Sequence, residues 1–331
     1  LHAPAGVAVA TARCMNGSRT APSFVRSLAE VRSGDVALVG GKNASLGELI
    51  GGLSSLGVAV PSGFAVTAEG YRHFLGEAKL EEPLRRIVQD LRPGDVDAVV
   101  RASAHIRELM MGATLPSDLA SEIDAAYRAL SRAYDEDATD VAVRSSATAE
   151  DLPNASFAGQ QESFLNVRGL VAVLDATKKA FASLFTPRAI SYRRDMGFDD
   201  LKVALSVGIQ KMVRSDRASA GVIFTLDPDT GHRGVILVTS SYGLGESVVQ
   251  GRVAPDQFYV HKATLASGHR SLFWKRLGTK ELRLVYDDHG QRDVATRQTA
   301  PEERAAFSLS DEDVLTLARW SMKIEEHYTT V

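Results

Sequence analysis

Cysteine is almost absent from this sequence of 331 residues, in which Cys14 is the only one. A single cysteine excludes a disulfide framework within the chain and a zinc site built from thiolates. It fits a reducing compartment, so we expect a cytoplasmic protein. The sequence also lacks an apolar run long enough to span a bilayer, and we expect no membrane as a partner.

A large excess of charge of either sign is absent as well. The 38 lysines and arginines and the 41 aspartates and glutamates leave a formal net charge of −3. Without a basic field the chain has no general attraction for nucleic acid, which we do not expect as a partner. Any site for an anion must therefore be built locally. The hydrophobic share of 44% is typical of a globular protein with one large or two modest domains.

Acidic residues are missing from the start of the chain, where Glu30 is the first. Three arginines precede it, and this bias has a weak similarity to an organelle transit peptide. A tail is the interpretation that we favour. We therefore predict that residues 1–22 lie outside the fold and that residues 23–331 form the folded domain.

Helical periodicity dominates the first half of the chain. It predicts a helix from about Thr67 and helices across residues 82–135, near 171–185, over 187–195, and after Ser310 at the C-terminal end. Within 82–135, two apolar stripes at helical spacing should face the core. They comprise Val96, Val99, Val100, Ile106, Leu109 and Met110 in one stripe, and Leu119, Ile123, Tyr127, Leu130 and Tyr134 in the other.

Short strand-like segments follow Arg144. They are rich in β-branched and aromatic residues and are separated by turn signals such as those at 227–231 and 243–245. Helices and runs of consecutive strands are segregated along the chain. This order predicts an α+β fold with mainly antiparallel sheets and flanking helices.

Two familiar nucleotide-binding motifs are absent. A P-loop ending at Lys42 would need glycine at position 36 and serine or threonine at position 43, where the chain has Val36 and Asn43. The segment GLGESV has Val248 in place of the third glycine of a dinucleotide fingerprint. The sequence supports neither of these folds.

Several dispersed groups are nevertheless suited to phosphate. Lys42 follows two glycines at a predicted helix start, where backbone N–H groups and the helix dipole favour an anion. Arg144 lies at a strand end and offers a fork for phosphate oxygens. The small, polar segment 154–161 lets the backbone approach a ligand. Taken singly, these features favour a solvated lysine, a surface ion pair and a plain loop; the combination favours a phosphate site.

Two further segments are compatible with nucleotide binding. The strand SVGIQKMV ends with Gln210 to Val213, and such a strand offers an adenine ring apolar walls and backbone partners, although a polar outward face fits the pattern equally well. Glu246 lies on a glycine turn, where it could meet a metal or a lysine. A lone glutamate in a turn is more often simply solvated.

Six long segments, in order from about residue 35 onward, resemble the N-terminal nucleotide-binding part of phosphoenolpyruvate synthases, the pyruvate, water dikinases. Pyruvate phosphate dikinases and rifampicin phosphotransferases share the same ATP-grasp-like domain. The segments are LVGGKNASLGELI, VPSGFAVT, AVRSSATAEDLPNASFAGQQESFLNV, FASLFTPRAISYRRDMGFD, VALSVGIQKMVRSDRASAGVIFTLDPDTG and SYGLGESVVQGRVAPDQFYVHK.

This resemblance implies an ATP-grasp-like fold with ATP between two lobes. It further implies that the β,γ-pyrophosphoryl group of ATP passes to a histidine on a separate phosphohistidine domain, which then phosphorylates pyruvate in a barrel domain. The overall reaction would convert ATP, pyruvate and water to phosphoenolpyruvate, AMP and phosphate. By motif match, the catalytic residues would be Lys42 and Arg144, and the ATP-binding residues would be Lys42, Arg144, Gly159, Gln160, Gln210, Met212, Val213 and Glu246.

The sequence also departs from the family pattern. The family's carrier histidine lies in a threonine-cysteine-histidine motif, and none of the eight histidines here has a neighbouring cysteine. The final segment IEEHYTTV resembles a stretch that precedes strands with magnesium ligands, so we expect a C-terminally incomplete domain that is inactive alone, with its Mg²⁺ ligands unknown. Two alternatives stay open: a related phosphotransferase with another acceptor, and a non-catalytic nucleotide-binding module.

Overall fold

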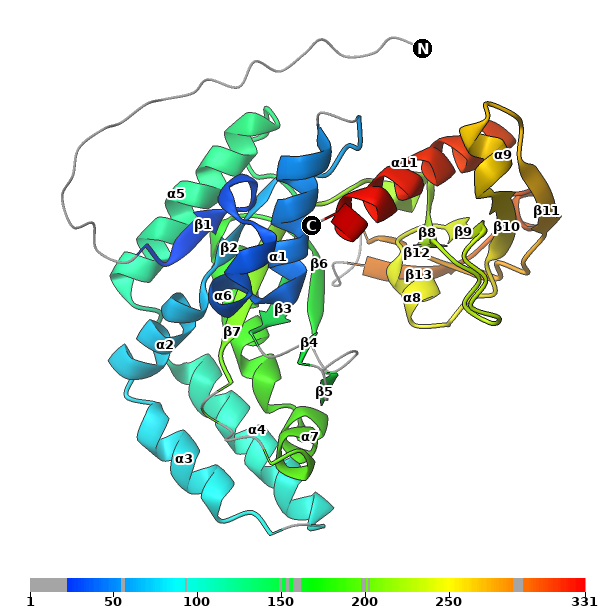
Figure 1. The fold of residues 1–331 in the computed structure, drawn as a ribbon. Coiled ribbons are helices and arrows are strands. Elements are labelled where there is room, and N and C mark those ends of the chain that lie inside the picture. The colour runs from blue at the N-terminus through cyan, green and yellow to red at the C-terminus, as the bar shows by residue number, and fades with distance from the viewer. Residues whose placement is uncertain are drawn as a thin grey trace.

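The computed structural model describes residues 23–330 except 55–56, 93, 149–150, 153–154, 157–161, 198–200, 202 and 288–293. Figure 1 shows two lobes side by side: a larger first lobe of residues 23–213 and a smaller second lobe of residues 214–330. The last helix of the second lobe runs back toward the first, so the end of the chain lies beside the first long helix.

An antiparallel five-stranded sheet with the order β1-β2-β7-β3-β6 forms the centre of the first lobe. A two-stranded hairpin, β4–β5, follows β3. The strands are β1 (Val25–Ser27), β2 (Gly63–Val66), β3 (Val141–Ala147), β4 (Asp151–Leu152), β5 (Ala155–Ser156), β6 (Ser163–Val167) and β7 (Leu205–Lys211).

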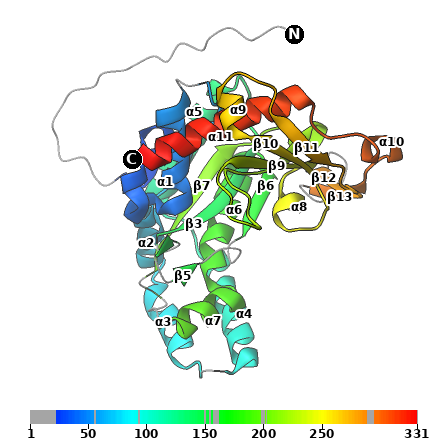
Figure 2. The same cartoon turned by 45° about the vertical axis from the view of Figure 1, so that its right-hand side comes forward.

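Helices cover both faces of this sheet. Helix α1 packs on one face around the buried Ala65, while the main core, with Val143, Ile209 and Phe181, lies between the other face and the remaining helices. Figure 2 shows α3, α4 and α7 as an extension beyond the sheet. The helices are α1 (Val36–Leu53), α2 (Ala68–Glu77), α3 (Glu81–Gln89), α4 (Val96–Gly112), α5 (Ser117–Ala133), α6 (Leu170–Ala182) and α7 (Pro187–Asp195), with short 3-10 turns at η1 (Leu28–Glu30), η2 (Ser33–Asp35) and η4 (Ser183–Phe185).

Both predicted core stripes are partly wrong, and in the second stripe Tyr134 is 36% exposed just after the end of α5. The first stripe differs more. Val99, which belongs to it, is buried as expected, but Val96 is 70% exposed and Val100 is 48% exposed. Val96 stands at the first position of α4, and Val100 is rotated by about 100° from Val99, so it leaves the buried face. Helical spacing identified the buried side of α4 but overestimated its width.

The second lobe contains an antiparallel sheet with the order β11-β10-β9-β8 and a separate β12–β13 hairpin. Helix α11 packs on the sheet and buries Val314 and Leu315 against Val238 and Phe258. The elements are η5 (Ser215–Arg217), β8 (Ser219–Phe224), β9 (Val235–Tyr242), α8 (Glu246–Val249), β10 (Asp256–His261), α9 (Lys262–Ala266), β11 (Leu272–Arg276), β12 (Leu282–Tyr286), β13 (Val294–Gln298), α10 (Pro301–Arg304) and α11 (Asp311–Thr330).

This arrangement confirms the predicted α+β class with antiparallel sheets and flanking helices. Thr67 caps α2 by accepting a hydrogen bond of 3.2 Å from the N–H of Gly70, which agrees with the predicted helix start. Among the described residues, no helix combines the length and the apolar character that a membrane crossing requires.

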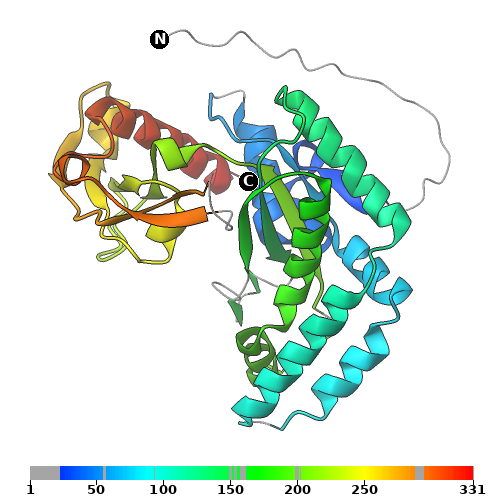
Figure 3. The ribbon, with the colours of Figure 1, turned by 180° about the vertical axis from the view of Figure 1, so that it is seen from behind.

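Polar contacts join the lobes on two sides. Near the point where the chain leaves β7 for the second lobe, the hydroxyl of Tyr286 on β12 donates a hydrogen bond of 2.6 Å to the buried carboxylate of Asp140. On the other side, the imidazole of His327 near the end of α11 lies 2.7 Å from Glu48 on α1. Seen from behind in Figure 3, α11 reaches from the second lobe toward α1.

Candidate functional site

Helix α1 is interrupted at Gly40, whose backbone has φ 74° and ψ 163°. A Cβ atom at this position would lie 2.3 Å from the Oγ atom of Ser146 on β3, so only glycine fits both the conformation and the space. A second helical segment therefore begins just before Lys42. At this start the backbone N–H of Asn43 donates to Ser146 Oγ at 3.4 Å, outside the helix, as first-turn N–H groups commonly do.

Asn43 holds this new helix start against the sheet. It is buried, and its amide nitrogen donates to the carbonyl of Val39 at 3.0 Å and to Ser206 Oγ on β7 at 3.1 Å. A Cβ atom at Gly208, also on β7, would lie 2.2 Å from Asn43 Oδ1. The absence of a side chain at Gly208 thus lets α1 approach β7 closely and places Lys42 over the sheet.

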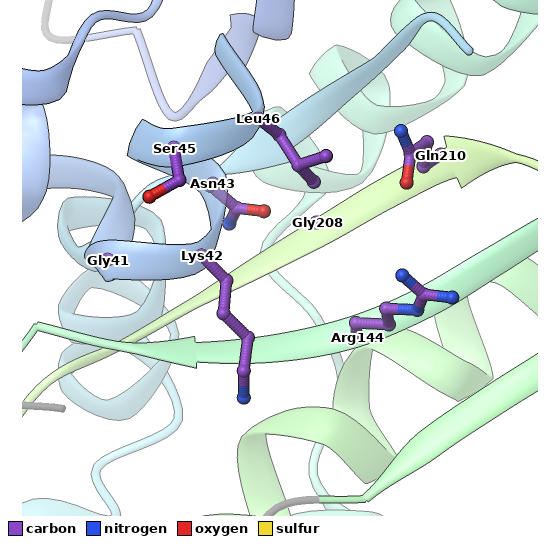
Figure 4. Close-up of a pocket in the computed structure, with 8 residues that line it drawn as sticks. All are labelled: Gly41, Lys42, Asn43, Ser45, Leu46, Arg144, Gly208 and Gln210. Carbon is purple, nitrogen blue, oxygen red and sulfur yellow. The ribbon is translucent and has the colours of Figure 1, made fainter. Parts of the chain in front are cut away.

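A pocket of about 350 Å³ lies where this helix start meets β3 and β7. The prediction that Arg144 lies at a strand end is wrong, because it stands in the middle of β3. It is paired across the sheet with Gly208, and Gln210 on β7 is paired with Ala142, so all four residues belong to the sheet face that α1 covers. Figure 4 shows Lys42 extending from the helix start across β3, and Arg144 extending from β3 on the Gln210 side. The lining residues are Gly41, Lys42, Asn43, Ser45, Leu46, Arg144, Gly208 and Gln210.

Arg144 brings a positive charge into this pocket. Its side chain reaches solvent, and within the described part of the chain its guanidinium has no hydrogen-bond or ion-pair partner. Protein atoms crowd around it, and this desolvation lowers the pKa of Arg144, while the negative charge of Glu246 in the second lobe acts in the opposite direction. An arginine remains charged at neutral pH, so an anionic ligand would complement it.

Gln210 places a polar side chain on the β7 side of the pocket. Its amide nitrogen donates a hydrogen bond of 3.0 Å to the carbonyl of Pro61, and the residue is 9% exposed. Figure 4 shows the amide oxygen on the side of Arg144. The pocket therefore combines positive charge at Lys42 and Arg144 with a hydrogen-bond acceptor at Gln210.

The other predicted site residues lie around the pocket or outside the described residues. Met212 packs between the lobes with Leu244 and Tyr286, and Val213 is 61% exposed; neither lines the pocket. Glu246 begins α8 in the second lobe, half-buried, where it accepts a hydrogen bond of 2.6 Å from Gln250. The remaining two predicted residues, Gly159 and Gln160, lie outside the described residues.

Sequence reasoning missed several pocket residues, among them Asn43, Ser45, Leu46 and Gly208. Gly208 carried a usable signal, because a glycine inside an apolar strand often marks the close approach of another backbone or of a ligand. On sequence alone, Asn43 provides evidence only against a P-loop. Its role depends on Ser206, which is 163 residues away and cannot be inferred from local pattern.

Comparison with protein families matches residues 36–331 to the pyruvate phosphate dikinase, AMP/ATP-binding domain family. The match covers most of the chain, which therefore belongs to this family of nucleotide-binding domains. The two-lobed α+β fold agrees with that membership.

Individual relatives sharpen the comparison. The chain is 50% identical over 306 residues to the phosphoenolpyruvate synthase of Synechocystis sp., 50% identical over 307 residues to that of Pseudomonas aeruginosa, and 49% identical over 297 residues to that of Escherichia coli. These alignments cover 91%, 92% and 89% of this chain but only 37%, 39% and 37% of the relatives. The resemblance noted in the sequence is thus confirmed, and the chain spans well under half the length of these relatives.

Proposed function

We propose that the pocket binds ATP, with Lys42 and Arg144 holding the triphosphate. The observation that supports this proposal best is the convergence of two cations from separate elements, α1 and β3, on one pocket at a helix start. The guanidinium offers two parallel hydrogen bonds to phosphate oxygens, and the lysine adds a compact point charge. Backbone N–H groups at the helix start complete an environment that favours negative charge.

The base of the nucleotide is proposed to lie toward the end of β7. Gln210 lines the pocket there, and we assign Met212 and Val213 as further neighbours of the adenine by the family resemblance. Gly159 and Gln160 are proposed to belong to a loop over the phosphates. Glu246, whose charge acts on Arg144, would contribute from the second lobe. Closure of the lobes on ATP would bring these groups together.

We further propose that residues 23–331 serve as the ATP-binding domain of a phosphoenolpyruvate synthase, with residues 1–22 as a tail. In such a protein the β,γ-pyrophosphoryl group of ATP would pass to a histidine of a phosphohistidine domain, with AMP as the leaving group. Water would then release the terminal phosphoryl as phosphate, and the remaining phosphohistidine would phosphorylate pyruvate in a barrel domain. Lys42 and Arg144 would offset the negative charge on the transferred group, which is the main protein contribution to catalysis of phosphoryl transfer. A cytoplasmic location is part of this proposal.

Magnesium is expected for this chemistry, because metal ions commonly bridge phosphate oxygens. Within the described residues, no group of three or more histidine, cysteine, aspartate or glutamate side chains is placed to hold a metal ion. The described residues alone therefore do not fit a magnesium site, and we assign no metal ligand to them.

Titration of ATP into the purified chain tests the proposal. Because hydrogen bonds to charged groups contribute about 1.5–3 kcal/mol each, Arg144→Ala should weaken ATP binding roughly tenfold to a hundredfold. Lys42→Ala should weaken it as well. Arg128 on α5 is a matched control, since its guanidinium is exposed and paired with Asp124 at 2.7 Å. Equal affinities of Arg144→Ala and Arg128→Ala, or no ATP binding by the parent chain, would contradict the proposal.

A further inference from the structure

The last turns of α11 contact α1 at Glu48 and Gly52, and we call this contact site on α1 the seat of His327. His327 Nε2 lies 2.7 Å from Glu48 Oε1, and the imidazole packs directly on Gly52. A Cβ atom at Gly52 would lie 2.7 Å from the Cε1 atom of this ring, so a side chain at residue 52 would push the imidazole out of its present place. The carboxylate of Glu48 and the space at Gly52 together make this contact between the lobes specific for the imidazole.

The seat is continuous with the candidate pocket. The hydroxyl of Tyr328 donates to the carbonyl of Ser45 at 3.4 Å, and Ser45 lines the pocket. Glu48 follows less than one helical turn later. It is 9% exposed, and its second carboxylate oxygen accepts a hydrogen bond of 3.2 Å from the N–H of Ser33. The helix that carries Lys42 is therefore the same rigid element on which the end of the second lobe rests.

The electrostatics of Glu48 agree with this geometry. The hydrogen bond to His327 is the largest cause that lowers the pKa of Glu48, followed by the bond from the Ser33 backbone, and Arg32 adds a smaller effect. Glu48 is therefore a carboxylate at neutral pH. Because Glu48 is largely buried, loss of the imidazole would leave its carboxylate with one hydrogen bond fewer to offset the cost of burial at the lobe contact.

We propose that His327 is a positioning residue for nucleotide binding: seated on Gly52 and bonded to Glu48, it sets the angle between the lobes and thereby brings Glu246 and its surroundings to the Lys42–Arg144 pocket. This inference rests on the proposed function. A protein whose binding-competent arrangement is populated only in part binds its ligand more weakly in proportion to that fraction. Release of α11 from α1 should therefore loosen the second lobe and weaken ATP binding without touching the pocket.

The distance between the lobes tests the seat directly and without nucleotide. Spin labels at Val171→Cys on α6 and Val249→Cys on α8, both highly exposed sites, can be introduced in a Cys14→Ser background. Pulsed electron paramagnetic resonance then measures the distance between the two labels. His327→Ala and Gly52→Ala should both broaden the distance distribution. Gly76→Ala on α2 is the matched control, since a Cβ atom there meets nothing within 4 Å.

ATP affinity tests the consequence in the same variants. We expect His327→Ala and Gly52→Ala to weaken ATP binding roughly threefold to tenfold, as the competent fraction falls. His327→Gln, whose amide can still donate to Glu48, should restore much of the affinity of the parent chain, which a general loss of stability would not allow. Gly76→Ala should bind ATP like the parent chain.

Two results would overturn the proposal: unchanged distance distributions in both His327→Ala and Gly52→Ala, or broadened distributions with unchanged ATP affinity. Absence of ATP binding by the parent chain would instead contradict the proposed function. In that case the distance measurement would still decide whether His327 holds the lobes in place, so the two failures are distinguishable.

Discussion

The hydroxyl of Tyr286 in the second lobe donates a hydrogen bond of 2.6 Å to the carboxylate of Asp140 in the first lobe, and Asp140 is only 1% exposed. The same carboxylate is bonded to Lys211 at the end of β7 and lies 3.7 Å from Arg168. The backbone carbonyl of Asp140 also accepts from the N–H of Met212 at 3.0 Å. The lobes are thus joined where the chain crosses between them, directly after Gln210.

Tyr286→Phe should lower the free energy of unfolding by about 1–3 kcal/mol, because a hydrogen bond to a buried carboxylate is lost. The phenyl ring would remain under the Arg214 guanidinium, which lies 4.4 Å from the ring centroid, so the change isolates the hydroxyl. Urea denaturation measures the effect. Tyr134→Phe is the control, since its hydroxyl bonds to Ser62 at the surface. Equal losses in the two variants would refute a special role for Tyr286.

Acid should destabilise the protein in part through Asp140 and Glu48. Burial alone would raise the pKa of Asp140, but its hydrogen bonds from Lys211 and Tyr286 outweigh burial and lower it. The hydrogen bond to His327 is the main reason that the pKa of Glu48 is also lowered. A carboxyl with a lower pKa in the folded state binds fewer protons there, so its stabilisation is present above the unfolded pKa of about 4 and is lost as pH falls through the folded pKa.

Urea denaturation between pH 3 and pH 7 tests this dependence. The free energy of unfolding should fall below about pH 5, where carboxyls of the unfolded chain begin to bind protons. Tyr286→Phe should flatten the fall, since it removes one of the bonds that lower the pKa of Asp140. Stability that rises on acidification, or the same slope in both proteins, would contradict the assignment.

Local patterns predicted much of the fold and part of the site. The helix start at Lys42, the strand of Arg144 and the strand of Gln210 follow from glycine placement, apolar periodicity and motif resemblance, which are all short-range features. The pairing of Arg144 with Gly208 and the bond of Asn43 to Ser206 depend on how distant elements pack. No periodicity in one segment indicates such contacts.

The contacts between the lobes were the least predictable from sequence. His327 and Glu48 are 279 residues apart, and Tyr286 and Asp140 are 146 residues apart. The resemblance of the segment IEEHYTTV to a family stretch assigns no contact to His327, and Gly52 has the pattern of an ordinary weak helix former. Their roles follow only from the shape of the seat, in which a missing Cβ atom makes room for an imidazole.

Gly40→Ala should disrupt the helix start that carries Lys42. Two costs combine: a non-glycine residue at φ 74° and ψ 163° is strained by about 1–3 kcal/mol, and its Cβ atom would collide with the side chain and backbone of Ser146. Gly169→Ala is a matched control, because Gly169 has φ 81° but open space around its Cβ position. Gly40→Ala should lose more stability than Gly169→Ala and should also weaken ATP binding. Equal losses in urea denaturation, with ATP affinity unchanged, would show that the close contact with Ser146 does not matter.

The chain by itself should release no AMP from ATP and pyruvate. The proposed reaction needs an acceptor histidine beside a cysteine, and the only cysteine, Cys14, is followed by Met15. Added Mg²⁺ should also change ATP affinity only weakly, since the described residues contain no cluster of three metal-binding side chains. A coupled assay for AMP with a control lacking protein measures turnover. Pyruvate-dependent AMP above that control would mean that another residue accepts the pyrophosphoryl group.

The central claim is that Lys42 and Arg144 hold the phosphates of ATP in one pocket between α1, β3 and β7. A crystal structure of the chain with a non-hydrolysable ATP analogue at saturating concentration tests it most directly. We predict phosphate oxygens within hydrogen-bond distance, about 2.7–3.2 Å, of the lysine ammonium and the arginine guanidinium, with the base toward Gln210. An analogue bound elsewhere, with both cations pointing away from its phosphates, would contradict the claim.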